Sequence, residues 1–112
     1  MLKKKGIYSL LQYISLLDLK SRDYKVLLYI MPKVNSEEFV KVNQKTIADE
    51  LSLSKSEVSK AIKKLVEEEI LMVNLQSENK RKKVELILGD FSKEELDDRI
   101  FELIDSNTIE DL

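Results

Sequence analysis

The chain has 112 residues, of which 43% are apolar and 36% charged, and it contains neither cysteine nor histidine. This length and balance suit one soluble domain with a modest, mostly aliphatic core. The two absent residue types exclude disulfides, thiolate metal sites, the usual zinc ligands and the commonest general base. We therefore expect no enzyme, no metal and no cofactor. No apolar run is long enough to span a membrane, and a cytoplasmic protein is expected.

Charge is unevenly distributed along the chain. Residues 1–83 hold 17 Lys and Arg against 11 Asp and Glu, whereas residues 84–112 hold 2 against 10. The first part carries +6 and the second −8, which gives the net charge of −2. A basic body is compatible with a nucleic-acid partner, although the acidic part has a simpler interpretation as a solvated helix face.

The N-terminal part predicts two helices and a short strand. Apolar residues at helical spacing predict a helix over about residues 7–17. Ser21 is expected to cap a second helix, which Pro32 would weaken or end by removing a backbone donor. Alternation in Glu38 to Val42 predicts a strand. The expected buried stripe of the second helix is Tyr24, Leu27, Leu28 and Met31.

The middle of the chain has the pattern of a helix-turn-helix. Asn43 is a good cap for a first motif helix from Gln44 to Leu51, and Ser52-Leu53 form a tight turn. Ser54 begins a second motif helix that runs to about Glu69. Ser54 and Glu57 have the spacing of a capping box, which explains both residues without any contact to DNA. Two crossing helices also need inward apolar or small residues. The chain supplies Ile47, Ala48, Leu51, Leu53, Val58, Ala61, Ile62 and Leu65.

The remaining segments predict a hairpin and an acidic helix. Ile70 to Gln76 and Val84 to Leu88 are predicted strands joined by a polar connection. Ser92 and Glu95 have capping-box spacing and would open a helix over about residues 92–106. The predicted fold class is α+β, mainly helical: a winged helix-turn-helix with additional N- and C-terminal helices. Residues 1–112 would form a single domain with its core at about 21–88.

The segment from Gln44 to Leu71 (QKTIADELSLSKSEVSKAIKKLVEEEIL) resembles the winged-helix core of MarR-type regulators and of RepL-type plasmid replication proteins. The preceding segment, Asp18 to Ala48, is similar to the RepL type in particular. The resemblance covers roughly residues 7–88 and implies binding to double-stranded DNA. It implies that the second motif helix enters the major groove and that the Gln76–Lys83 hairpin touches the backbone or minor groove.

Candidate DNA contacts lie on the outer faces of this motif. Lysine and serine can donate to base edges, and cations pair with phosphates, although each set could also be solvated surface alone. The second motif helix offers Lys55, Ser56, Ser59, Lys60 and Lys63. The first motif helix offers Gln44 and Lys45 at its start, and the hairpin tip offers Asn79, Lys80, Arg81, Lys82 and Lys83.

Arginine is missing from the second motif helix, since the chain's three arginines are Arg22, Arg81 and Arg99. Lysine replaces arginine poorly in bidentate base contacts, so specificity would be modest or would depend on DNA shape and paired sites.

The two terminal helices allow two interpretations. Their apolar stripes either complete the domain's own core or form a homodimer, which we favour because small domains bury little surface alone. The leading hypothesis is a sequence-specific DNA-binding protein, either a transcriptional regulator or a plasmid or viral replication protein. The alternative is a winged-helix protein-interaction module that uses its acidic C-terminal helix. The expected apolar stripe of the N-terminal helix is Ile7, Leu10, Leu11, Ile14 and Leu17, and that of the C-terminal helix is Leu96, Ile100, Leu103 and Ile104.

Overall fold

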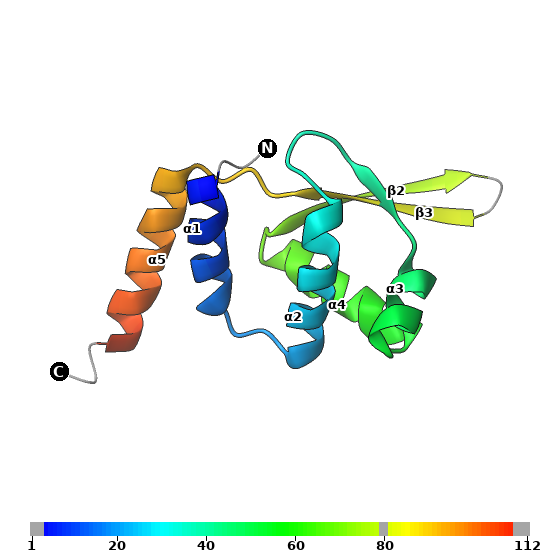
Figure 1. The fold of residues 1–112 in the computed structure, drawn as a ribbon, viewed down its shortest axis with the longest axis horizontal. Helices are drawn as coiled ribbons and strands as arrows, with labels where there is room; N and C mark the ends of the chain where they lie inside the picture. The colour runs from blue at the N-terminus through cyan, green and yellow to red at the C-terminus, as the bar shows by residue number, and fades with distance from the viewer. Residues whose placement is uncertain (1–3, 79–80, 109–112) are drawn as a thin grey trace. The chain divides into compact units, whose positions relative to one another are not determined.

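The computed structural model describes residues 4–78 and 81–108, and at positions 4–6, 75–78, 81–83 and 106–108 it describes the backbone alone. Within these residues the chain forms five α-helices, a short 3-10 helix and one three-stranded sheet (Figure 1). The order is α1 (Lys4–Ser15), α2 (Ser21–Ile30), η1 (Met31–Lys33), β1 (Val40–Val42), α3 (Gln44–Leu51), α4 (Lys55–Glu67), β2 (Leu71–Glu78), β3 (Arg81–Leu88) and α5 (Lys93–Thr108). The predicted α+β, mainly helical winged helix-turn-helix is confirmed.

The backbone divides into two compact units. The first is the continuous segment Leu19–Gly89, which holds the helix-turn-helix and the sheet. The second combines residues 2–18 with residues 90–112, so the two terminal helices belong together. That residues 1–112 act as one domain stays a prediction.

Local hydrogen bonds set the bounds of α3 and α4. Asn43 Oδ1 accepts from the Thr46 N–H at 3.2 Å and caps α3 as predicted. Ser52 ends α3 in the left-handed region, at φ 56° and ψ 42°. Ser54 Oγ accepts from the Glu57 N–H, and the Glu57 carboxylate accepts from the Ser54 N–H, both at 3.0 Å. The predicted capping box is thus confirmed, and α4 ends two residues before the predicted Glu69.

Helix α2 begins one residue earlier than its predicted cap implies. Lys20 is the N-cap residue, and its N–H donates to Asp23 Oδ2 at 3.0 Å, so Ser21 is already the first helical residue. The predicted stripe was wrong in phase: Leu27 is buried, but Leu28 is 62% exposed. The buried face instead consists of Asp23, Val26, Leu27 and Ile30. The helix ends at Ile30, before Pro32, as predicted from the backbone donor that proline lacks. Pro32 itself lies in η1.

The sheet is antiparallel, with strand order β1-β3-β2. Strands β2 and β3 are longer than predicted because their pairing continues to Glu78 opposite Arg81. The ladder is made by backbone hydrogen bonds, so strand pairing can continue beyond the apolar alternation that indicates the strands in the sequence. Strand β1 is shorter than predicted because the Asn35 side chain accepts from the N–H groups of Glu37 and Glu38, at 2.8 and 2.9 Å. Those amides belong to a turn.

The core of the first unit lies where α2, α3, α4 and the sheet meet. Helix α4 contributes all four of its predicted inward residues, Val58, Ala61, Ile62 and Leu65, and each is buried. The predicted Ile47 and Ala48 are buried on α3, whereas Leu51 and Leu53 are half-buried. The sheet side is closed by Ile70, Leu71, Leu86 and Leu88, which are all buried.

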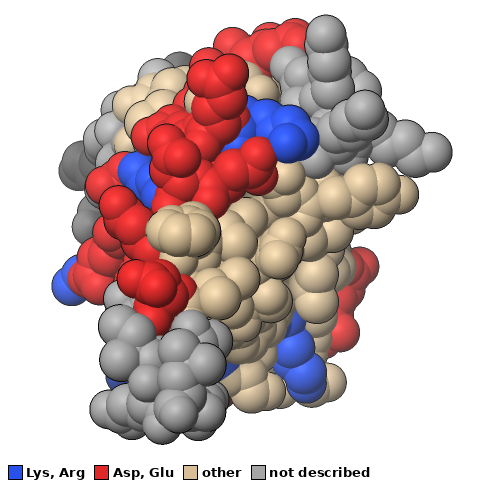
Figure 2. Space-filling view, turned by 90° about the vertical axis from the view of Figure 1, so that its left-hand side faces the viewer, with Lys and Arg blue, Asp and Glu red and all other residues tan. Residues whose placement is uncertain are grey.

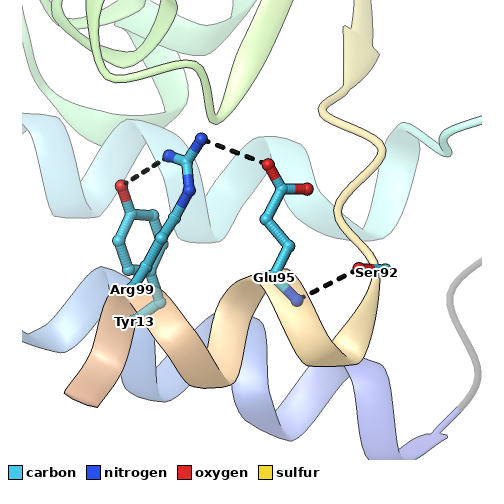
Figure 3. A network of polar contacts seen from close by, with 4 residues as sticks. All are labelled: Tyr13, Ser92, Glu95 and Arg99. Carbon is cyan, nitrogen blue, oxygen red and sulfur yellow. Dashed lines mark hydrogen bonds and ion pairs between the residues drawn. The ribbon is translucent and has the colours of Figure 1, made fainter. Parts of the chain in front are cut away.

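The second unit is held together by packing between α1 and α5. Figure 3 shows Arg99 of α5 beside Tyr13 of α1 and Glu95. The Arg99 guanidinium donates to Tyr13 Oη at 3.2 Å, lies 3.4 Å from Glu95 Oε1 and stacks 4.8 Å from the Phe91 ring centroid. Of the predicted stripes, Leu10, Ile14, Leu96 and Ile100 are buried, and the structure adds Tyr13 and Phe91. Among the described residues, no helix is long and apolar enough to cross a membrane.

Candidate nucleic-acid interface

The outer face of α4 is basic and exposed. Its predicted contact residues are all exposed, while the opposite face of the same helix is buried in the core. The capping box uses the Ser54 hydroxyl and the Glu57 carboxylate, so neither is free to read bases. The exposed residues of this face are Lys55, Ser56, Ser59, Lys60 and Lys63.

Two ionisable side chains of α4 have pKa values shifted by neighbours within the helix. The Ser54 N–H and hydroxyl group lower the pKa of the Glu57 carboxyl. The Glu68 carboxylate, 3.1 Å from Lys64 Nζ, raises the pKa of that lysine. Lys64 is therefore engaged along the helix, which distinguishes it from the exposed lysines of the outer face.

The start of α3 contacts the outer face of α4. Ser59 Oγ donates to Gln44 Oε1 at 2.6 Å, across 15 positions of sequence. Gln44 is half-buried and Lys45 is exposed. The structure thus brings together two predicted contact residues from the two motif helices. No sequence signal indicates this pairing, because it depends on how the helices cross.

The hairpin tip is described only in part. Asn79 and Lys80 lie outside the described residues. Arg81, Lys82 and Lys83 belong to β3, where their backbones pair with Glu78, Ser77 and Gln76. Arg81, Lys82 and Lys83 therefore lie at the hairpin end of the β2–β3 pair, in the same unit as α3 and α4.

Acidic residues and the polar groups of the motif bear on two kinds of ligand, a metal ion and DNA. No group of three or more His, Cys, Asp or Glu in the described part of the chain is arranged to hold a metal ion. The outer faces of α3 and α4 carry amide, hydroxyl and ammonium groups. These groups can donate hydrogen bonds to phosphate oxygens and to the acceptors of bases.

Several solved structures are similar to this chain. The chain is similar to a possible transcriptional regulator from Methanosarcina mazei Go1, at 20% identity and a TM-score of 0.59, over 90% of this chain and 78% of that one. A MarR transcriptional regulator from the same organism is similar at 18% identity and a TM-score of 0.49, over 89% and 66%. MepR of S. aureus, in a complex with DNA, is similar at 18% identity and a TM-score of 0.47, over 96% and 79%.

At 20% identity, the first of these likenesses shows a shared fold. It agrees with the predicted winged helix, whereas the resemblance to RepL-type proteins stays a prediction. No curated protein matches the chain. A family model described as "DnaD N-terminal domain" matches residues 8–111, which covers the first unit from Leu19 to Gly89 and most of the second. Because this match extends over most of the sequence, the chain belongs to the DnaD N-terminal domain family.

Proposed function

We propose that the chain binds double-stranded DNA sequence-specifically through its winged helix-turn-helix, without a catalytic step, as a transcriptional regulator or a plasmid or viral replication protein in the cytoplasm. The observation that carries this proposal is the exposed basic face of α4, with Lys55, Lys60 and Lys63 opposite a buried apolar face. In helix-turn-helix proteins the N-terminal part of the second helix meets base edges in the major groove. Membership of the DnaD N-terminal domain family supports the replication role.

Specificity in this proposal comes from modest contacts repeated over two half-sites. Lysine acts as a point charge and discriminates bases less sharply than arginine, which is absent from α4. A two-fold symmetric protein matches a palindromic site and doubles the number of contacts. A homodimer is therefore part of the proposal.

The terminal helices α1 and α5 supply the dimer contact in this proposal. They expose large apolar side chains, with Tyr8 at 62% and Phe101 at 70% exposure. Figure 2 shows a face of the protein on which an uncharged area lies beside acidic residues. An exposed apolar surface with a polar rim is typical of a protein contact site. The acidic residues of α5 would form the rim of the interface.

The same surface supports a second candidate function. Phe101 and Ile104 are exposed on α5 next to Glu102 and Asp105, which would suit a basic amphipathic partner. In that case the motif would serve as a scaffold, and α5 would be the binding element. The two candidates differ in whether the protein has affinity for DNA.

Titration of a labelled random-sequence duplex at two salt concentrations tests the proposal. We expect binding at low salt that weakens as salt rises, because cations that contact phosphates release counterions. Lys60→Glu and Arg81→Glu should each weaken binding, and Lys60→Ala should reduce the salt slope by about 1 if Lys60 contacts a phosphate. Glu102→Lys, on the acidic helix, should not weaken binding if that helix faces away from the duplex. Absence of binding at low salt would refute the DNA proposal and favour the second candidate.

A further inference from the structure

The Gln44–Ser59 hydrogen bond joins the outer surfaces of the two motif helices. Gln44 is the first residue of α3, and Ser59 lies on the exposed face of α4 between Ser56 and Lys60. At 2.6 Å, the Ser59 hydroxyl is a close donor to Gln44 Oε1. In the part of the chain that the structure describes, no other group pairs with either side chain.

This bond uses one end of the glutamine carboxamide and leaves the other. A glutamine side chain has an acceptor oxygen and an amide nitrogen with two donor hydrogens. Glutamine reads adenine in a bidentate manner by using both ends, one as donor and one as acceptor. Ser59 occupies one of the two lone pairs of Oε1 and orients the carboxamide, so that among the described residues the amide nitrogen, with its two donor hydrogens, is the end of Gln44 without a protein partner. The sequence-independent acceptors of a duplex are its phosphate oxygens.

The hydrogen bond from Ser59 orders the Gln44 side chain before DNA binds, which lowers the entropic cost of binding. A free glutamine side chain loses rotamer freedom when it docks on DNA, and that loss opposes binding. The bond from Ser59 holds Gln44 in one orientation in the free protein, so less freedom remains to be lost. Lys45, exposed at the next position, adds a positive charge beside the amide.

We infer that Gln44 donates a hydrogen bond to a DNA phosphate and that Ser59 is a positioning residue for Gln44 rather than a base reader. This inference rests on the proposed DNA binding. It removes Ser59 from the predicted base-reading set and leaves Lys55, Ser56, Lys60 and Lys63 on α4. The pair would set the register of the motif on the backbone, and α4 would supply the sequence preference.

A double-mutant cycle tests the coupling. Gln44→Ala and Ser59→Ala are each expected to weaken binding to a random-sequence duplex by roughly two- to tenfold, the effect of one hydrogen bond. The double variant should bind no more weakly than Gln44→Ala, because Ser59 acts through Gln44. Ser59→Thr keeps the hydroxyl group and should retain binding. Thermal unfolding of each variant verifies that the fold is intact.

Charge variants identify the phosphate as the target. Gln44→Glu keeps the acceptor for Ser59 but replaces the amide donor with a carboxylate, so it should weaken binding more than Gln44→Ala does. Leu28→Glu adds the same charge at an exposed position of α2, outside the proposed DNA and dimer surfaces, and serves as the control. Gln44→Ala should leave the salt slope unchanged because a neutral amide displaces no counterion, whereas Lys45→Ala should reduce the slope by about 1.

Selection from a random-sequence pool separates positioning from base reading. The sequence enriched by Ser59→Ala should match that enriched by the unaltered protein. A different enriched sequence for Ser59→Ala would overturn the inference, and so would losses of affinity that add up in the double variant. In either case, duplex binding by the unaltered protein and its weakening by Lys60→Glu would still support the proposed function. If the unaltered protein does not bind a duplex at low salt, both the proposed function and the inference fail.

Discussion

Asp23 is a buried charged residue, with 2% exposure, at the start of α2. Its Oδ2 accepts from the Lys20 N–H, and its Oδ1 lies 3.6 Å from Arg22 Nε. Oδ1 and Arg22 Nε are both buried and without a hydrogen-bond partner. A buried carboxylate is costly unless it is paired, so the cap and the neighbouring guanidinium together offset its desolvation.

Removal of the Asp23 side chain should destabilise the first unit. Asp23→Ala deletes the acceptor of the α2 cap and leaves the partly buried Arg22 without its counter-ion. We expect a loss of about 1–3 kcal/mol in the free energy of unfolding, measured by urea titration. Asp49→Ala, at an exposed position of α3, should change stability by no more than about 0.5 kcal/mol. Equal effects of the two substitutions would contradict a structural role for Asp23.

Glu57 should make stability depend on pH. The Ser54 N–H and hydroxyl group hold the pKa of the Glu57 carboxyl below its ordinary value of 4.5. The folded state therefore favours the charged carboxylate, and this contribution is fully present above the unfolded pKa and lost as pH falls through the folded pKa. The difference in unfolding midpoint between the unaltered protein and Glu57→Gln should be largest near pH 7 and shrink below about pH 4.5.

The α3 cap gives a matched comparison for this pH dependence. Asn43 caps α3 with a neutral side chain. Asn43→Ala should therefore lower the unfolding midpoint by a similar amount at every pH from 7 to 3. If the Glu57→Gln difference were likewise independent of pH, the charged capping box would not be the source of the effect.

The turn between α3 and α4 requires a left-handed residue. Ser52 occupies it with φ 56°, and its N–H donates to Asp49 O at 3.4 Å. A side chain with a Cβ atom is strained in this conformation, whereas glycine is not. Ser52→Gly should raise stability by about 0.5 kcal/mol, and Ser52→Val should lower it by more than 1 kcal/mol. Thermal unfolding followed by circular dichroism measures both.

Ser56, inside α4, provides the contrast for the Ser52 substitutions. Its backbone is helical, so glycine there adds conformational freedom to the unfolded chain and relieves no strain. Ser56→Gly should lower stability by about 0.5 kcal/mol. If Ser52→Gly raises stability and Ser56→Gly lowers it, the left-handed turn is the source of the effect. Changes in stability of the same sign would contradict strain at Ser52.

Formation of the proposed homodimer should depend on α5. Phe101 is 70% exposed, so its replacement removes little from the folded chain itself. Phe101→Asp should shift the protein from dimer to monomer in sedimentation velocity at micromolar concentration, with an unchanged thermal midpoint at the lowest concentrations. Phe39→Asp, on the first unit, is the matched control and should leave association unchanged. A monomeric unaltered protein would argue against the proposed dimer.

The helix-turn-helix was predictable from short-range signals. Caps at Asn43 and Ser54 act within one helical turn, and the inward residues of α4 follow helical periodicity, so their effects can be read from neighbouring positions. The predicted exposure of the α4 contact residues followed from the same periodicity. The buried face of α2 was not predictable from apolar spacing, because that face includes the charged residue Asp23.

Contacts between distant segments required the three-dimensional structure. The Gln44–Ser59 bond depends on the crossing of α3 and α4, and the Arg99–Tyr13 bond joins residues 86 positions apart. The sequence therefore established the helices, their caps and the basic face of α4, because backbone hydrogen bonding and helical periodicity act locally. The fold established which polar groups pair across helices and which chain segments form each unit, because those contacts depend on packing that no single stretch of residues specifies.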